Sequence, residues 1–385
     1  MNLRPPRVVI IGAGLSGLYA ASLLESKNYD YIVLEARDAP GGRIASIDGV
    51  AGSASAATAI DRFDLGPAWF WPQYQRDLEC VIRKLDLASF EQFDTGDTLM
   101  DRGPHQPPVR LQGYSSSPTS MRLIGGMNAL VDALRGALDP ERIATGQAVR
   151  RLRRVAEHVE VDSEDAGGVT TTWHADHVLL ALPPRLAEYS LTIDPPLPPT
   201  LAQSWRSTAT WMAPHAKYIA IYDRPFWRED GLSGEARSAP GPLGEIHDAS
   251  MPGASAALFG FLSVPAHLRR TIGSDALKAQ CRAQLTRLFG PQAAAPRMEA
   301  FKEWAQETYT AVPDDLIAAG HHAVAPASKA SYGPWHQRVT GIASEWSTSF
   351  PGYLAGAIEA AASGVNALER DHRFSQHVIR PRHAL

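Results

Sequence analysis

The N-terminal stretch VVIIGAGLSGLYAASLLESKNYDYIVLEARDAPGGR, Val8 to Arg43, constrains the fold more than any other part of the chain. The β-branched run Arg7 to Ile11 predicts a buried strand, and the small and apolar spacing of Gly17 to Ser26 predicts a helix packed on a sheet. Tyr31 to Glu35 predicts the next strand. A strand, helix and strand of this size form a βαβ unit, in which a helix joins two parallel strands. The sequence therefore predicts an α/β fold.

The glycines between the first strand and the helix indicate what this unit binds. Gly12 permits the tight turn, Gly14 lets backbone approach a pyrophosphate, and Gly17 lets helix and strand pack closely. The phosphates then meet the helix N-terminus at Ser16. Glu35 follows about 20 residues on, where a carboxylate accepts hydrogen bonds from a ribose. These residues predict a Rossmann-like domain that binds an ADP-containing dinucleotide.

The composition excludes several other classes of protein. With 385 residues, 44% of them apolar, the chain can bury a sizeable core. The 37 Lys+Arg against 41 Asp+Glu give a formal charge of −4 without a long basic run, so we expect a small-molecule partner and no nucleic acid. Only two cysteines are present, Cys80 and Cys281, and they lie too far apart in sequence for a Cys-x-x-Cys site. So few cysteines, without a disulfide framework, are typical of proteins from a reducing cytoplasm. His321 and His322 are adjacent and would diverge on regular structure, so no metal site is expected.

The ends of the sequence have only part of the pattern of a targeting signal. Arg4 and Arg7 before an apolar run resemble a signal peptide, but three glycines interrupt that run and acidic, turn-rich sequence follows. No segment of about 18 uninterrupted apolar residues occurs, and the C-terminus is polar. We therefore expect a soluble, cytoplasmic protein with no membrane partner.

Further elements are predicted along the rest of the chain. The expected helices are Gln75 to Phe90, Met127 to Leu138 after Gly125-Gly126, Asp275 to Phe289 with Ser274 as N-cap and Gly290 as stop, and a final helix near the C-terminus. The expected strands lie in Val149 to Val161, in HVLLALPP ending at Pro183, in Lys217 to Tyr222 and in Ala257 to Ser263. The expected loops are Ala51 to Ala59 and Pro104 to Pro118, and Pro195 to Pro199 suggest a crossing into another domain.

The continuation LEARDAPGGR, residues 34 to 43, distinguishes between cofactors. Gly41-Gly42 allow a second close approach of backbone, and Arg37 and Arg43 are suited to neutralise pyrophosphate charge. Here the chain resembles the flavin-containing amine oxidases, which include monoamine oxidases, polyamine oxidases and the flavin-dependent histone lysine demethylase. In that family a Leu-Glu-Ala-Arg-x-x-x-Gly-Gly-Arg run follows the dinucleotide fold, and residues 34 to 43 reproduce it without a gap. The resemblance implies FAD.

The resemblance covers most of the chain. DLGPAW, Asp64 to Trp69, is similar to the family's strand and turn that pass the flavin ring, and VLLALPP matches the strand that closes the flavin domain. The segment ASEW…PGYLAGAIEAA is similar to the family's last fingerprint, with Ala343-Ser344 in place of Gly-Thr. The FAD contacts that the resemblance implies are Gly12, Gly14, Ser16, Gly17, Glu35, Arg37, Gly42, Arg43, Gly66, Ala68, Trp69, Val149, Glu345 and Leu354.

The resemblance also implies a set of catalytic residues. HAKYIAIYDRPFWR resembles the segment in which a lysine precedes Pro-Phe-Trp, which implies that Lys217 lies by flavin N5 and bonds to it through a water. Burial would lower the pKa of this lysine and a reduced flavin would favour its cation, so its charge stays open. EWAQETYTAVPDD resembles the segment that places Trp304 beside the flavin and Tyr309 in one wall of an aromatic cage, with Tyr353 in the other wall. Two aromatic planes on either side of a channel suit an amine.

Departures from the family pattern refine these expectations. Thr308 stands where animal monoamine oxidases carry the cysteine that bonds to the flavin, so we expect non-covalent FAD. The turn GPAWFWP lacks the arginine with which L-amino-acid oxidases bind a carboxylate, and its Trp69, Phe70 and Trp71 are apolar, which favours a hydrophobic or aromatic monoamine. The insertion from Tyr74 to about Thr119 is short, which leaves two alternatives: a more open site, or one that a second subunit of a homodimer covers.

The expected fold is an α/β (α+β two-domain) protein with a discontinuous FAD-binding domain, residues 1–75, 120–192 and 305–385. An interleaved substrate-binding domain of mixed sheet and helices, residues 76–119 and 193–304, completes it. The expected reaction is oxidation of an amine to an imine by hydride transfer to flavin N5, with hydrolysis to a carbonyl and reduction of O2 to H2O2. The alternatives are a flavin desaturase or dehydrogenase like protoporphyrinogen oxidases and carotenoid desaturases, a non-catalytic FAD-binding scaffold, and a plain NAD(P)-dependent dehydrogenase.

Overall fold

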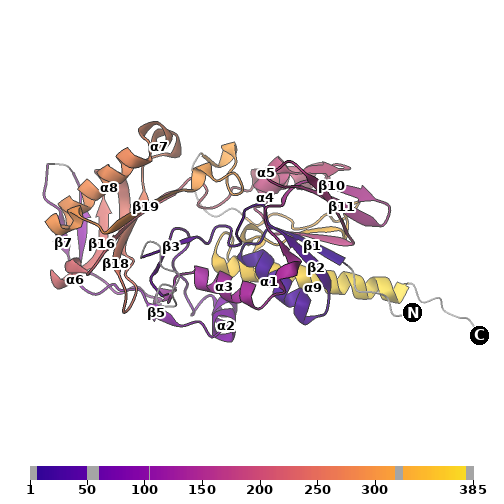
Figure 1. Cartoon of the computed structure of the whole chain (residues 1–385), viewed down its shortest axis with the longest axis horizontal. Coiled ribbons are helices and arrows are strands. Elements are labelled where there is room, and N and C mark those ends of the chain that lie inside the picture. The colour runs from indigo at the N-terminus through magenta and orange to yellow at the C-terminus, as the bar shows by residue number, and fades with distance from the viewer. Residues whose placement is uncertain (1–6, 50–59, 104, 317–323, 379–385) are drawn as a thin grey trace, which may run out of the picture. The chain divides into compact units, whose positions relative to one another are not determined.

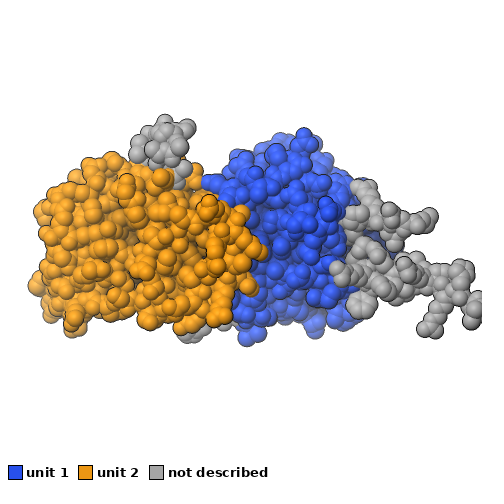
Figure 2. Space-filling model, turned by 90° about the horizontal axis from the view of Figure 1, so that it is seen from below, with its two compact units in different colours: residues 1–42, 131–211, 319–385 blue, residues 43–130, 212–318 orange. Residues whose placement is uncertain are grey.

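The computed structural model describes residues 7–49, 60–103, 105–316 and 324–378, with side chains up to residue 371. The chain forms two compact units, which Figure 2 colours blue and orange. Unit 1 comprises Met1–Gly42, Val131–Trp211 and Ala319–Leu385, and unit 2 comprises Arg43–Leu130 and Met212–Ala318. The expected loop Ala51 to Ala59 and the pair His321-His322 lie outside the described residues.

Unit 1 is built on a five-stranded parallel sheet of order β20-β13-β1-β2-β9. The first βαβ unit forms as the sequence predicts, because β1 and β2 are short apolar runs buried on both faces, as parallel strands usually are. The crossover helix α1 packs against the C-terminal helix α9, and Figure 1 shows them side by side. The bounds are β1 (Arg7–Ile11), α1 (Leu15–Ser26), β2 (Asp30–Leu34), β9 (Ile143–Ala144), β13 (His177–Leu180), β20 (Val339–Gly341) and α9 (Leu354–Val378).

A second, four-stranded sheet of unit 1 has the order β12-β11-β10-β14. Alternate residues of β11 are buried, so one face of this sheet joins the core around Leu152, Trp205 and Trp335 while the other face is polar. The bounds are β10 (Ala148–Val155), β11 (His158–Glu164), β12 (Thr170–Ala175), α4 (Pro184–Ser190), β14 (Thr192–Asp194) and α5 (Pro199–Ser207), with 3-10 turns η1 (Pro140–Arg142) and η5 (Ser344–Trp346).

Unit 2 contains a seven-stranded mixed sheet of order β19-β15-β18-β17-β16-β6-β7. Successive residues of β15 face two separate apolar clusters, one around Tyr218 and Trp227 and the other around Ile219 and Phe259. The bounds are β6 (Asp97–Asp101), β7 (Val109–Leu111), β15 (Ala216–Tyr222), α6 (Phe226–Glu229), β16 (Leu232–Ser238), β17 (Leu243–Asp248), β18 (Ala256–Leu262), α7 (Ala266–Ile272), α8 (Ser274–Phe289), η2 (Pro291–Ala294), β19 (Met298–Glu303), η3 (Trp304–Gln306) and η4 (Pro313–Leu316).

Two small antiparallel sheets, β3-β4 and β5-β8, also belong to unit 2. The β3-β4 pair leads into the turn that begins at Leu65. Helix α3 starts in unit 2 and continues into unit 1. The bounds are β3 (Ser46–Asp48), β4 (Arg62–Asp64), α2 (Arg76–Lys84), β5 (Ser89–Glu91), β8 (Met121–Leu123) and α3 (Asn128–Gly136).

Three local predictions were wrong. The helix expected to reach Phe90 ends at Lys84, because Asp86 takes a left-handed conformation (φ 54°) and Ser89–Glu91 pairs with β8. The Pro104 to Pro118 segment is not all loop, since Val109–Leu111 pairs with β6. Ser274 is the first residue of α8 and Gly273 is its N-cap.

The predicted α/β fold class is confirmed. Among the described residues, no helix combines the length and the apolar character needed to cross a membrane.

Candidate active site

The turn after β1 leaves no room for side chains. Gly12 has φ +103°, and a Cβ there would lie 2.9 Å from the Ala181 oxygen. A Cβ at Gly17 would lie 1.9 Å from the Gly12 oxygen, so helix α1 approaches the strand closely only with glycine at that position. The N-cap Gly14 offers no side chain to the helix end, and the first turn, which includes buried Ser16, carries no acidic residue. This helix N-terminus therefore suits an anion.

The second glycine pair lies beside the first. Gly14 and Gly41 form a parallel bridge, and the Gly41 N–H donates to the Ala13 oxygen at 2.9 Å. A Cβ at Gly42, where φ is +60°, would lie 3.2 Å from Gly14 Cα. The backbones of the two glycine pairs thus lie against each other without side chains between them, which leaves a ligand room to approach as both motifs predict.

Glu35 follows β2 and is buried beside this turn, with 3% of its surface exposed. Its Oε2 accepts from the Ala13 N–H at 2.7 Å, and its Oε1 accepts from the Arg37 N–H at 2.9 Å. The Arg37 guanidinium lies 3.9 Å from the same Oε1. Each carboxylate oxygen has two acceptor positions, so the fixed carboxylate is still able to accept from ribose hydroxyls.

The C-terminal fingerprint of unit 1 surrounds the start of α9. Glu345 is buried in η5, and its Oε2 accepts from the Ser344 hydroxyl at 3.1 Å. Gly352 has φ +83°, and its N–H donates to the Ser344 oxygen at 3.1 Å. Half-buried Tyr353 follows, and α9 begins at Leu354, so the tyrosine lies immediately before a helix N-terminus.

Val149, expected to contact adenine through its backbone, lies on β10 of unit 1 and is 9% exposed. The pairing of β10 with β11 shifts register between Val149 and Arg151, which is the signature of a bulge or irregularity. Bulges recur where a strand must redirect a group towards a site.

Lys217 is the central feature of unit 2. It extends from β15, is 2% exposed, and its Nζ donates to the Gly66 oxygen at 3.1 Å. The Nζ also lies 4.0 Å from the ring centroid of Phe259 and 5.7 Å from that of Phe261. The fold therefore brings the predicted lysine onto the predicted DLGPAW turn, across 151 residues of sequence.

The charges around Lys217 determine its protonation. Burial lowers the pKa of Lys217 to about 7, an effect that the Asp64 charge opposes and the Arg122 charge assists. Burial also raises the pKa of Asp64, whose Oδ1 accepts from the Met127 N–H at 2.8 Å and the Ser46 hydroxyl at 3.0 Å. Near neutral pH, Lys217 is therefore suited both to give and to take a proton.

Trp304 closes the same turn from another side. Its Nε1 donates to the Leu65 oxygen at 3.0 Å, and its ring lies 4.7 Å from Lys302 Nζ. A Cβ at Gly66 would lie 2.0 Å from the Arg43 oxygen and 3.5 Å from Trp304 Cζ2. Arg43, Gly66, Lys217 and Trp304 thus come together in unit 2.

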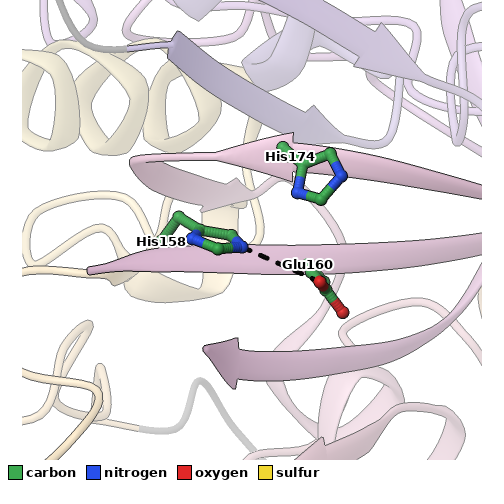
Figure 3. Close-up of side chains that lie close together, drawn as sticks. All are labelled: His158, Glu160 and His174. Atoms are coloured by element: carbon green, nitrogen blue, oxygen red, sulfur yellow. Dashed lines mark ion pairs between the residues drawn. The ribbon is translucent and has the colours of Figure 1, made fainter. Parts of the chain in front are cut away.

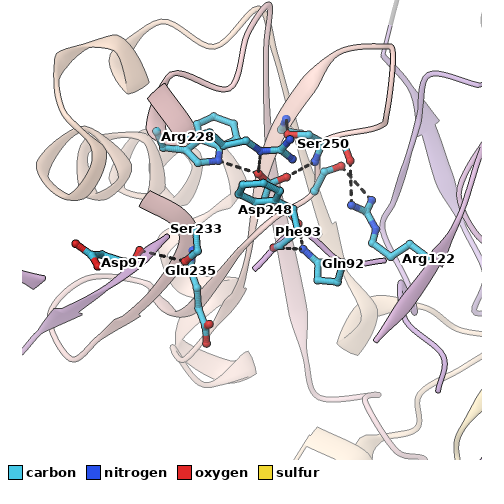
Figure 4. Close-up of polar contacts among 12 residues, drawn as sticks. Gln92, Phe93, Asp97, Arg122, Arg228, Ser233, Glu235, Asp248 and Ser250 are labelled. Carbon is cyan, nitrogen blue, oxygen red and sulfur yellow. Dashed lines mark hydrogen bonds and ion pairs between the residues drawn. The ribbon is translucent and has the colours of Figure 1, made fainter. Parts of the chain in front are cut away.

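A buried polar network holds Trp69, the last residue of the turn. Trp69 Nε1 donates to Gln92 Oε1 at 2.8 Å, and Gln92 Nε2 donates to the Asp248 oxygen at 2.9 Å. The Asp248 carboxylate accepts from Trp227 Nε1 at 2.8 Å and from Arg228 Nε at 2.7 Å, and Figure 4 shows the contact with Arg228. The Trp69 ring packs on the rings of His247 and Phe259, and the preceding Ala68 is buried.

Arg122 joins this network from β8. Its guanidinium donates to the oxygens of Ala249 and Ser250, at 3.0 and 3.1 Å, as Figure 4 shows for Ser250. The strand that carries Asp248 is thereby tied to the strand that follows the short insertion. Apolar Trp69 surface is consequently held in a fixed place within unit 2.

The two tyrosines of the expected cage lie in different units and are described separately. Tyr309 is half-buried in unit 2, next to exposed Thr308, and Tyr353 belongs to unit 1. Their joint role in binding an amine stays a prediction.

Comparison with known proteins identifies the family. A sequence model for flavin containing amine oxidoreductases matches residues 109–368, which is more than half of the chain. The chain belongs to the flavin-containing amine oxidoreductase family. A model for NAD(P)-binding Rossmann-like domains matches residues 10–85 of this family member.

Individual relatives agree with this assignment. The Mycobacterium tuberculosis protein that bears the name flavin-containing monoamine oxidase AofH is 31% identical over 271 residues, 66% of this chain and 54% of the relative. A "Probable flavin-containing monoamine oxidase A" of Dictyostelium discoideum is 28% identical over 253 residues, 62% of this chain and 51% of the relative. The chain spans about half the length of these relatives. A solved structure of putrescine oxidase bound to putrescine superposes with a TM-score of 0.78 at 20% identity, covering 95% of this chain and 99% of the other, and this shows the shared fold.

FAD is the cofactor that this family carries, and the described residues fit it. The glycine positions that a Cβ would fill and the uncapped α1 N-terminus suit the pyrophosphate, and buried Glu35 suits a ribose. The family resemblance implies contacts with the group from Gly12, Gly14, Ser16, Gly17, Glu35, Arg37, Gly42, Arg43, Gly66, Ala68, Trp69, Val149, Glu345 and Leu354, and these contacts stay predictions.

The sequence did not single out the charged groups around Lys217. Asp64 was noted only as part of the DLGPAW motif, and Arg122 was not noted. The available signal was a charged residue inside a short apolar run, as in Met121–Leu123. Such residues are rarely fully buried unless they are paired.

Proposed function

We propose that this protein is an FAD-dependent oxidase that converts a hydrophobic or aromatic monoamine to an imine. The amine loses two electrons and two protons, O2 takes up both to give H2O2, and water hydrolyses the imine to a carbonyl compound and an amine or ammonia. The observation that carries the proposal is Lys217, which is buried on the Gly66 turn with its pKa lowered to about 7, in a member of this family. FAD when bound supplies the two-electron chemistry.

In this proposal, the glycine turn and Glu35 contact the cofactor, and Lys217 is the catalytic lysine. Lys217 Nζ holds a water through one hydrogen bond while it donates another to the Gly66 oxygen. Since its pKa is about 7, the amine form and the ammonium form are both populated near neutral pH. Lys217 therefore relays protons during the reduction of O2.

Apolar groups determine the substrate class that we propose. Trp69 and Phe261 are half-buried, and Phe259 packs between them in unit 2. Such rings favour a hydrophobic amine, and we propose that Tyr309 and Tyr353 orient its nitrogen. The names of the relatives include monoamine oxidases as well as putrescine oxidase, so a diamine belongs in the test.

The function is tested by the visible spectrum of the purified protein under anaerobic conditions. Aromatic and alicyclic monoamines, putrescine and L-phenylalanine are added separately, and peroxide is measured after air is admitted. We expect the flavin bands to bleach with a monoamine and peroxide to form. Bands that no amine bleaches would contradict the proposal and favour a desaturase or a scaffold, and bleaching by putrescine alone would overturn the monoamine preference.

The role of Lys217 is tested by separating the two half-reactions. Lys217→Met removes the titrating group, so we expect reoxidation by O2 to slow by roughly 100-fold or more, within the range of general acid–base effects. Reduction by the amine should change by only a few-fold. Lys278→Met is the matched control, since Lys278 lies on α8 of the same unit, paired with exposed Asp275. Equal losses in both half-reactions would exclude a role specific to O2.

A further inference from the structure

The polar face of the second sheet in unit 1 brings two histidines and a glutamate together. His158 and Glu160 are two residues apart on β11, so their side chains lie on the same face. His174 on the neighbouring strand β12 pairs directly with Glu160. Figure 3 shows the three side chains side by side on these antiparallel strands. The register alone thus brings three potential metal ligands together.

The atoms that would ligate an ion are close to one another. One ligand atom from each residue lies within 4.8 Å of the other two, and His158 Nε2 lies 3.7 Å from Glu160 Oε1. Ligands at about 2.0–2.1 Å from a tetrahedral zinc ion lie roughly 3.3 Å apart, so small side-chain rotations close the site. Although His158 Nε2 is buried, it has no hydrogen-bond partner. A buried polar atom without a partner is costly, and an ion would satisfy it.

Arg153 leaves the ligating oxygen of Glu160 open. This arginine projects from β10 opposite Glu160, and both its Nε and its terminal nitrogen donate to Oε2. The other oxygen, Oε1, faces His158. An outer partner that fixes one oxygen orients the carboxylate and leaves the second oxygen for a metal.

We propose that His158, Glu160 and His174 bind one divalent transition-metal ion of the zinc class, with solvent completing its coordination. Two imidazoles and one carboxylate favour Zn2+ over Mg2+ or Ca2+, which prefer oxygen ligands. His174 is exposed, so the ion has a path in and a position for water. None of the three residues belongs to the set assigned to FAD or to the amine, and the proposal does not depend on the proposed oxidase activity.

The test measures Zn2+ binding to the full-length, tag-free protein with its flavin, after treatment with a chelator. Calorimetric titration with ZnCl2 should give one tight site. The loss of a direct ligand in His158→Ala or His174→Ala should weaken that site by more than the roughly 10–100-fold typical of outer partners. His267→Ala is the matched control, because His267 is exposed on α7 of unit 2, and it should bind as the wild type does.

A second measurement uses Co2+, whose visible absorption reports nitrogen and oxygen ligation. We expect bands with the wild type and with His267→Ala, and their loss in His174→Ala. Zn2+ binding that is absent from the wild type, or that is equal in the wild type and both cluster variants, would overturn the site. Titration with MgCl2 should give no comparable binding, and tight Mg2+ binding would contradict the choice of metal class.

Discussion

At the scale of single residues, the pair Asp64 and Lys217 links the fold to the chemistry. Asp64 is fixed by the Met127 N–H and the Ser46 hydroxyl, both of which donate to Oδ1. Its Oδ2 is buried without a hydrogen-bond partner. Its charge acts on Lys217, whose pKa it raises against the effect of burial.

Replacement of Asp64 by Asn tests this coupling. Asn keeps an oxygen acceptor for Met127 and Ser46 but removes the negative charge, so the cationic form of Lys217 loses stabilisation. We expect the pH midpoint of flavin reoxidation to lie near 7 in the wild type and at lower pH in Asp64→Asn. The measurement is the reoxidation rate from pH 5.5 to 9 by stopped flow, an interval chosen to bracket the lysine titration.

The control for this experiment is Asp275→Asn, since Asp275 is exposed on α8 and pairs with Lys278. Its profile should match that of the wild type. A midpoint that moves to higher pH in Asp64→Asn would contradict the assignment to Lys217. A reoxidation rate of the wild type that does not change with pH would also contradict it.

The sequence predicted the residues that depend on local spacing. The turn that contains Gly12, Gly14 and Gly17 and leads on to Glu35 forms as expected, because the turn, the helix start and the next strand are neighbours in the chain, while its contact with FAD stays a prediction. The contacts of Asp64, Arg122 and Asp248 join segments far apart in sequence, and no local pattern encodes such pairings. Lys217 and Trp304 were found only through a family resemblance, since a lysine on an apolar strand has no signature of its own.

At the scale of elements, the packing of α1 on β1 makes the strongest demand on one residue. A Cβ at Gly17 would lie 1.9 Å from the Gly12 oxygen, a distance that requires the helix to shift. We expect Gly17→Ala to displace the helix N-terminus, to abolish or strongly weaken FAD retention, and to lower the thermal midpoint. Both effects are measured on the purified protein by flavin-to-chain ratio and by thermal unfolding.

Gly136→Ala is the matched control for that substitution. Gly136 ends α3, its φ is not positive, and a Cβ there meets nothing within 4 Å. Alanine reduces the conformational freedom of the unfolded chain, so this variant should retain FAD and be as stable as the wild type or slightly more stable. Full FAD retention in Gly17→Ala would show that the close approach of α1 is not required.

The β16–β17 region depends on the carboxylate of Asp248. That side chain is 1% exposed and accepts from Trp227, Arg228 and the Ser250 N–H. Asp248→Ala leaves the Trp227 N–H and the partly buried Arg228 without this acceptor. Because the loss of one partner from a buried pair costs about 3–5 kcal/mol, we expect a loss near the lower end of that range. Denaturant unfolding measures it, and Asp275→Ala, an exposed change, should stay within about 0.5 kcal/mol.

Pairing with another strand, which local sequence does not show, also explains why Ser89–Glu91 and Val109–Leu111 were not predicted as strands. Ser89–Glu91 has the composition of a helix continuation, yet Met121–Leu123 supplies a partner strand that outweighs it. Val109–Leu111 is likewise a strand only because β6 lies beside it. The α/β class was predictable, since parallel strands buried on both faces are visible as apolar runs.

At the scale of the whole molecule, the two units are interleaved in the sequence, so the residues proposed for the cofactor and for catalysis come from segments spread over the entire chain. Arg43 and Gly66 lie in unit 2 while the dinucleotide turn lies in unit 1. Every segment must therefore fold for the proposed set of residues to exist. A protein of this kind is expected to lose flavin as it unfolds, and the mode of flavin attachment decides whether that loss is visible.

The residues of the chain predict that the flavin is bound without a covalent bond. Thr308 occupies the position where the family resemblance implied a cysteine in covalent members, and it carries a hydroxyl in place of a thiol. The two cysteines are free: Cys80 is exposed on α2, and Cys281 is fully buried in α8, where burial raises the pKa of its thiol to about 12. A buried thiol that stays protonated is a poor nucleophile. Acid denaturation followed by filtration should therefore release all of the flavin, with free FAD added to a parallel denatured sample to measure recovery. Flavin that stays with the precipitated chain after full recovery in the control would show a covalent bond, and peptide mapping would then locate the residue that forms it.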